Sequence, residues 1–168
     1  MKGFTLLELM IVVSVMAVLI MGATLVMYKT LSSRGQNQAE TNINQAGSQA
    51  MEAIEQSVKF STIEGVGVVK RATCLTAGAG GISGSTLSVS DSWGTTTYSL
   101  NASSKIASNS AEISGSLVVV TNLSFTWLCA QGYPDKLRIS FEMNDAEVSD
   151  VLLKRTFRRD ISLYNSGI

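Results

Sequence analysis

The chain has 168 residues, of which 45% are hydrophobic and 15% are charged. This length suits one membrane-anchoring segment and one small globular domain, and a second domain is not expected. Thirteen basic residues balance thirteen acidic ones, so no overall field draws the chain to nucleic acid or anionic lipid. Histidine, the commonest general base and metal ligand, is absent from the sequence. We therefore expect no enzymatic activity, no metal and no cofactor.

An apolar segment runs from Phe4 to Met27, and its single ionisable side chain is Glu8. As a helix it would be about 36 Å long, which is enough to cross a bilayer. In an ordinary secretory signal, small residues mark a cleavage site after a shorter apolar stretch. Here the small residue, Gly3, lies before the stretch. Removal of residues 1–3 would therefore leave the whole helix in the mature protein.

Glu8 is the unusual residue of this segment, because an acid within hydrocarbon costs about 2.5–3.5 kcal/mol unless a partner compensates it. Cleavage after Gly3 would create an α-amino group on Phe4, one helical turn from Glu8. The amine of the same chain is hard to reach with good geometry. A neighbouring subunit, displaced by about one turn, could present its own Phe4 amine instead. The alternative is a tolerated acid near the helix end that reaches the interface or is protonated.

The residues KGFTLLEL at positions 2–9, followed by the apolar run, resemble the class III signal of type IV pilins and pseudopilins. The resemblance implies that a prepilin peptidase and methyltransferase cuts after Gly3 and methylates Phe4. It also implies that Glu8 pairs with the N-terminus of an incoming subunit. The expected partners are thus other pilin or pseudopilin subunits and membrane lipid. Many pilins kink this helix with a proline, whereas the one proline here is Pro134, and Gly22 is a weaker candidate break.

The apolar periodicity continues beyond the membrane segment to about residue 60. Apolar residues recur there at spacings of three and four, which predicts a helix with one narrow apolar face packed on a sheet. Gly35 and Gly47 weaken this helix by about 1 kcal/mol each and mark candidate bends. The apolar positions are Ala39, Ile43, Ala46, Ala50, Ile54 and Val58.

After Gly65 the composition changes to Gly, Ser and Thr with short β-branched or aromatic runs, which is typical of an antiparallel sheet. The Gly- and Ser-rich segment 77–85 is expected to be a flexible surface loop. Apolar residues alternate with polar ones from Leu137 to Met143, which predicts a strand with one core face. The expected strands are 66–75, 86–89, 95–100, 116–129 in one or two pieces, 136–143 and 151–163. Residues 136–165 also resemble the closing hairpin of minor pilins and general-secretion pseudopilins.

The fold class is therefore α+β, with a long N-terminal helix packed on a C-terminal antiparallel sheet. The expected organisation is a leader at 1–3, a transmembrane and assembly helix at 4–27, an amphipathic helix at 28–60 and a β-rich head at 61–168. The resemblance implies a structural subunit of a type IV pilus-like or type II secretion pseudopilus filament. It would pass once through a bacterial-type inner membrane before joining an extracytoplasmic filament. A minor or tip subunit that binds DNA or another ligand, and an anchored domain that never polymerises, are the alternatives.

The two cysteines, Cys74 and Cys129, lack the paired short spacings of zinc sites. In an oxidising space they could form one disulfide, which would stabilise the head by about 4 kcal/mol. Two free buried thiols are the alternative.

A basic cluster consists of Lys154, Arg155, Arg158 and Arg159. Val151, Leu153, Phe157, Ile161 and Leu163 share one parity, which favours a strand and divides the cluster between two faces. Lys154 and Arg158 would form one candidate ligand surface for phosphates. An ion-paired edge is favoured over DNA contact, because acids lie close by at Asp145, Glu147, Asp150 and Asp160. Core or loop packing is expected for the aromatic residues that could otherwise stack on bases or sugars, which are Trp93, Tyr98, Trp127 and Tyr133.

Overall fold

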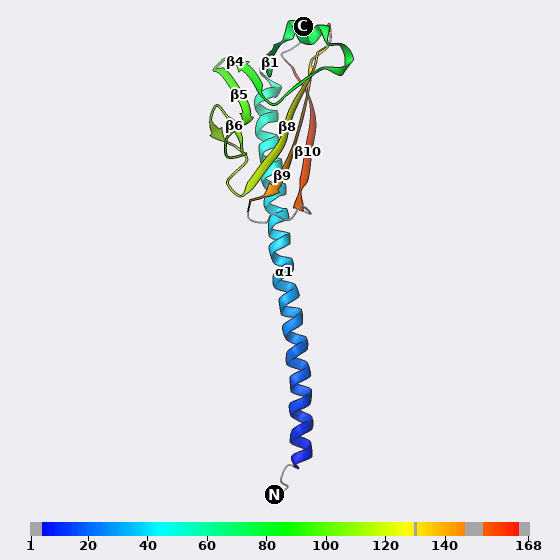
Figure 1. Cartoon of the computed structure of the whole chain (residues 1–168). Helices are drawn as coiled ribbons and strands as arrows, with labels where there is room; N and C mark the ends of the chain where they lie inside the picture. The colour runs from blue at the N-terminus through cyan, green and yellow to red at the C-terminus, as the bar shows by residue number, and fades with distance from the viewer. Residues whose placement is uncertain (1–4, 130, 147–152, 165–168) are drawn as a thin grey trace. The chain divides into compact units, whose positions relative to one another are not determined.

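The computed structural model describes residues 5–129, 131–146 and 153–164. A long helix, α1 (Leu6–Lys59), is followed by antiparallel strands, so the expected α+β layout is confirmed (Figure 1). The chain divides into two compact units, Met1–Gln38 and Ala39–Ile168, and α1 contributes to both.

In the first unit, α1 has apolar side chains on all of its faces as far as Met27. Its large hydrophobic side chains from Leu6 to Leu31 are between 49 and 79% exposed. By length and composition, this is the one helix among the described residues that could cross a membrane. No part of its most apolar stretch is buried within the chain.

In the second unit, α1 has the single apolar face that its periodicity predicts. Ala39, Ile43, Ala50, Ile54 and Val58 are at most 2% exposed, and Ala46 is partly buried. The helix runs through Gly47, where an added Cβ would lie 2.2 Å from Cζ of Phe157. The glycine therefore allows the Phe157 ring to press against the helix backbone. It does not end the helix.

The strands form two antiparallel sheets, where the sequence indicated one. The first has the order β2-β1-β4-β5-β6-β7, and the second has the order β10-β9-β8-β3. The first sheet contains β1 (Thr62–Val66), β2 (Val69–Lys70), β4 (Leu87–Asp91), β5 (Gly94–Leu100), β6 (Ile106–Ser108) and β7 (Ala111–Glu112). The second contains β3 (Ile82–Gly84), β8 (Val118–Leu128), β9 (Lys136–Asp145) and β10 (Arg155–Ser162).

Two local predictions were wrong. The strand expected at 66–75 is interrupted, because β1 ends at Val66 and Gly67 turns the chain with a φ of +62°. After the short β2, residues Arg71–Thr76 form a helix, α2. The loop expected at 77–85 contains a 3₁₀ turn at Gly78–Gly80, and β3, which pairs with β8.

The long strands β8 and β9 contribute many of the core side chains. Leu137, Ile139, Phe141 and Met143 in β9 have no exposed surface, which confirms the predicted core face. One buried cluster joins side chains from α1 and from both sheets. Lys105, between β5 and β6, further connects the sheets, because its ammonium donates to the carbonyl of Ser116 at 2.7 Å and to that of Val118. The second unit thus has a hydrophobic core of its own.

Candidate functional site

The predicted processing residues, Gly3 and Phe4, lie outside the described residues. The structure describes the motif from Thr5 onward. Thr5 precedes the first helical residue, and its Oγ1 accepts the backbone N–H of Glu8 at 3.3 Å. The Thr5 carbonyl accepts the same N–H at 3.1 Å and that of Leu9 at 3.3 Å. Thr5 is therefore the N-cap of α1, and Glu8 occupies the third helical position.

The role of Thr5 as a helix cap was not among the predictions from the sequence. Thr5-x-x-Glu8 has the spacing of a capping box, in which the acid at the third position can accept the N–H of the capping residue. A carboxylate there is also favoured by the positive end of the helix dipole. The pattern was visible in the sequence as Ser/Thr-x-x-Glu before an apolar run. Position 8 thus favours an acid for the start of the helix, an effect that is distinct from any docking function.

The other polar groups of the apolar stretch are satisfied within the helix. The hydroxyl of Ser14 donates to the carbonyl of Met10 at 2.8 Å, and that of Thr24 donates to the carbonyl of Met21 at 2.9 Å. Such bonds hide hydroxyls from an apolar environment. Glu8 is exposed, between Leu7 and Leu9, which are 71 and 60% exposed. Among the described residues, no basic side chain forms an ion pair with it.

In the second unit, Cys74 of α2 and Cys129, which follows β8, are joined by a disulfide with 5.8 Å between their Cα atoms. The bond attaches α2, which follows β2 of the first sheet, to the end of β8, a central strand of the second sheet. Asp135 lies in the same region and is fully buried. Its Oδ2 accepts Nε1–H of Trp127 at 3.1 Å and Nε–H of Arg71 at 3.3 Å. These side chains together fix α2 against the end of β8.

The basic cluster is divided between two faces, as its strand parity predicts. Lys154 Nζ lies 2.5 Å from Oε2 of Glu142, on the face of the second sheet that points away from the core. Arg159 has the opposite parity and donates to the carboxylate of Glu55 on α1. Glu55 and Glu142 thus pair with members of the cluster, in addition to the acids expected from the sequence. Of those expected acids, Asp160 lies near the charge of Arg158, whereas Glu147 and Asp150 lie outside the described residues.

Asp160 forms a two-pronged pair with Arg138, which faces it across β9 and β10. Nε of Arg138 donates to Oδ1 at 2.8 Å, and Nη2 donates to Oδ2 at 2.9 Å. These bonds hold the pKa of the Asp160 carboxyl below its ordinary value, and the nearby charge of Arg158 adds to this effect. Hydrogen bonds from Lys154 and Asn122 likewise lower the pKa of Glu142. The candidate ligand surface of Lys154 and Arg158 thus lies among carboxylates.

The four aromatic residues divide into two pairs. Trp127 is fully buried and Tyr98 is 4% exposed, so both pack in the core as expected. Trp93 is 95% exposed and Tyr133 is 70% exposed, and packing was the wrong expectation for these two.

Comparison with known proteins adds one match. Residues 1–24 match the family described as the prokaryotic N-terminal methylation motif. No curated protein and no solved structure matches the chain. The matched residues include the predicted cleavage position, the capping Thr5 and Glu8, and they extend into the exposed apolar part of α1. The N-terminus of the chain therefore carries the methylation motif that is the signature of type IV pilins and pseudopilins.

Proposed function

We propose that this protein is a structural subunit of a type IV pilus-like or type II secretion pseudopilus filament. The observation that carries the proposal is the methylation motif at the start of a helix that is apolar on all sides and exposed. The precursor is held in the inner membrane by residues 4–27, is cut after Gly3 and is methylated on Phe4. Its head, residues 61–168, then faces outward from the filament.

The exposed helix supplies the physical basis of assembly. Eighteen or more apolar residues cannot remain in water, so they are covered by lipid before assembly and by other helices after it. Exchange of lipid for helix contacts brings little net hydrophobic gain, because both surroundings are apolar. A charged contact can therefore decide the axial position. Glu8 provides it by pairing with the Phe4 amine of a neighbouring subunit.

The first test is the mass of the mature N-terminus in cells that contain an active prepilin peptidase. We expect a chain that begins at N-methylated Phe4. A chain that begins at Met1 in assembled filaments would contradict the proposal.

The second test separates docking from helix capping at Glu8. Glu8→Gln keeps a side chain that can complete the capping box but removes the charge. Thr5→Ala removes the cap, at a cost of about 1 kcal/mol, but keeps the acid. Both variants should insert and be cleaved. We expect Glu8→Gln and Glu8→Ala to lose incorporation into filaments, and Thr5→Ala to retain most of it.

Normal incorporation of Glu8→Gln would refute the docking role. Equal losses in Glu8→Gln and Thr5→Ala would point to the helix start as the determinant. Recovery of cleaved but monomeric wild-type chain, with the other filament subunits present, would support an anchored domain that does not polymerise.

A further inference from the structure

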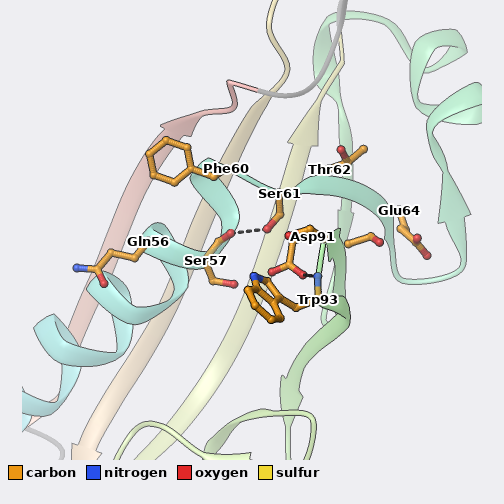
Figure 2. A pocket seen from close by; sticks show the side chains of 10 residues that line it. Gln56, Ser57, Phe60, Ser61, Thr62, Glu64, Asp91 and Trp93 are labelled. Carbon is orange, nitrogen blue, oxygen red and sulfur yellow. Dashed lines mark hydrogen bonds between the residues drawn. The ribbon is translucent and has the colours of Figure 1, made fainter.

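An open groove of about 690 Å³ lies in the second unit, between the end of α1, β1 and the hairpin of β4 and β5. Trp93 stands at its edge and is 95% exposed. Figure 2 labels Trp93 among the side chains that line the groove, together with Asp91 of the same hairpin. Burying so large an aromatic side chain would contribute more to folding than exposing it. The exposure of Trp93 therefore does not contribute to the folding stability of the chain.

The indole is presented by a rigid turn. Asp91 and Gly94 pair directly, so that Ser92 and Trp93 form a two-residue hairpin loop. Oδ1 of Asp91 accepts the backbone N–H of Trp93 at 2.7 Å and that of Gly94 at 3.1 Å. Gly94 has a φ of +138°, which favours glycine. The turn thus fixes the backbone from which the indole projects, so that binding need not order this loop.

The rest of the lining is polar. It supplies hydroxyls from Ser57, Thr62, Ser90 and Ser92, as well as the amide of Gln56. Carboxylates come from Asp91 and Glu64, and none of the ten described lining residues is basic. Two carboxylates without a cation repel a phosphate backbone and accept hydrogen bonds from hydroxyl groups. The charge of these lining residues therefore disfavours nucleic acid, while the ammonium of Lys59 lies outside them, 5.6 Å from the ring centroid of Tyr164.

A second exposed ring extends the groove. Phe60, at its other edge, is 64% exposed and stacks on Tyr164, with 5.8 Å between the ring centroids and an interplanar angle of 13°. The backbone N–H of Tyr164 donates to the carbonyl of Lys59 at 3.2 Å, which fixes this pair at the end of α1. Figure 2 shows Phe60 on the side of the groove opposite Glu64. The groove thus has exposed aromatic rings, Trp93 and Phe60, at its edges and polar side chains between them.

We infer that this groove binds a neutral saccharide chain. A sugar ring has an apolar C–H face that can lie on an indole and a rim of hydroxyls that can bond to carboxylates, amides and serines. A protein partner would favour a continuous apolar centre with a polar rim, whereas here Trp93 is surrounded by polar side chains. The volume lies within the range of small-molecule sites. The site goes beyond the proposed assembly function and does not depend on it.

The test uses the full chain in a detergent without a sugar head group. Calorimetric titration with cellohexaose, chitohexaose and maltohexaose at millimolar concentrations should give saturable binding of at least one. Trp93→Ala should weaken that binding by about tenfold or more. Tyr133→Ala is the matched control, because it removes another exposed aromatic ring that does not line this groove. It should bind as the wild type does.

Asp91→Asn offers a finer variant, since the amide oxygen can still accept the two backbone N–H groups while the charge is lost. It should weaken sugar binding and leave the melting temperature unchanged. Three results would overturn the inference. One is no binding of any of the three sugars, and another is equal binding by Trp93→Ala. The third is tighter binding of a single-stranded DNA oligonucleotide or of galacturonate hexamer than of the neutral sugars.

Discussion

The two parts of helix α1 use apolar side chains in opposite ways. From Leu6 to Leu31 the large ones are 49 to 79% exposed, whereas the buried apolar residues from Ala39 to Val58 are at most 3% exposed. The first stretch is apolar on all sides, so no single packing partner in the chain could cover it. The second has one narrow face that the sheets cover. One continuous helix thus contains an exposed apolar stretch, which we propose associates with other molecules, and a buried apolar face that stabilises the head.

The acidic residues of the two parts of α1 also differ, in whether a basic side chain of the same chain pairs with them. Glu55 of the second unit accepts a bond from Arg159 of its own chain. Glu8 of the first unit has no described cation against it, although it lies in a far less polar segment. An acid that finds its partner within the chain contributes to folding. An acid without one in an apolar segment is suited to select a neighbour.

The largest expected effect on stability lies in the second unit, at the disulfide. Cys74→Ser combined with Cys129→Ser should lower the free energy of unfolding of the head by about 4 kcal/mol. Helicity and membrane insertion of residues 4–27 should be unchanged, because both cysteines belong to the other unit. Chemical unfolding followed by tryptophan fluorescence measures the difference. A reductant should destabilise the wild type and leave the double variant unaffected. Free-thiol labelling of both cysteines in the native protein would contradict the prediction.

Two isoleucines of α1, one in each unit, test whether exposed and buried apolar side chains of this helix contribute differently to folding stability. Ile54 has no exposed surface and Ile20 is 63% exposed, yet both lie on α1. Ile54→Ala leaves a cavity and should lower the free energy of unfolding by about 3 kcal/mol. Ile20→Ala should change it by less than about 0.5 kcal/mol, as for an ordinary surface substitution. Ile20→Ala should instead reduce incorporation into filaments. Equal destabilisation by the two substitutions would mean that the first unit is packed against the head.

Long periodic segments were the parts of the fold that the sequence could predict. The spacing from Ala39 to Val58 identified the buried face of α1, and the alternation from Leu137 to Met143 identified the core strand. The strands expected at 86–89 and 95–100 are present as β4 and β5, whereas the three-residue strand β3 escaped prediction because pairing with distant residues creates it. Ile82–Gly84 is a strand only through Phe125, Thr126 and Trp127 of β8. Nothing within a Gly- and Ser-rich run records such a partner.

The candidate sites show the same limit. The motif at positions 2–9 was visible because its residues are contiguous, and so was the Thr5-x-x-Glu8 spacing that was missed. Gly47 was interpreted as a helix weakness, since its close contact with Phe157 joins residues far apart in sequence. Trp93 was expected to pack, because composition does not distinguish a buried indole from one held outward by a turn. The contact of Gly47 thus depends on a distant segment, whereas the exposure of Trp93 and the cap at Thr5 arise from local turns.

The smallest expected effect concerns the charged face of the second sheet. The pKa of Asp160 is lowered in the folded chain, mainly by hydrogen bonds from Arg138. The pair therefore stabilises the fold fully above the ordinary pKa of 3.8, and this contribution is lost as the pH falls through the lowered folded value. Asp160→Asn should lower stability slightly at neutral pH and show a shallower loss of stability in acid. The difference should shrink at high salt, because the pair is exposed.

Glu142→Gln provides the control for that measurement. The pKa of Glu142 is also lowered, first by Lys154, from an ordinary value of 4.5. Its contribution should therefore begin to fade at a slightly higher pH than that of Asp160, if both carboxyls are charged in the native head. Unfolding curves recorded across the acid range for both variants can resolve this order. An acid profile that is unchanged in both variants would show that these pairs do not stabilise the head. The outer face of the sheet would then be a set of solvated charges, in contrast to Glu55 of α1, which pairs with Arg159.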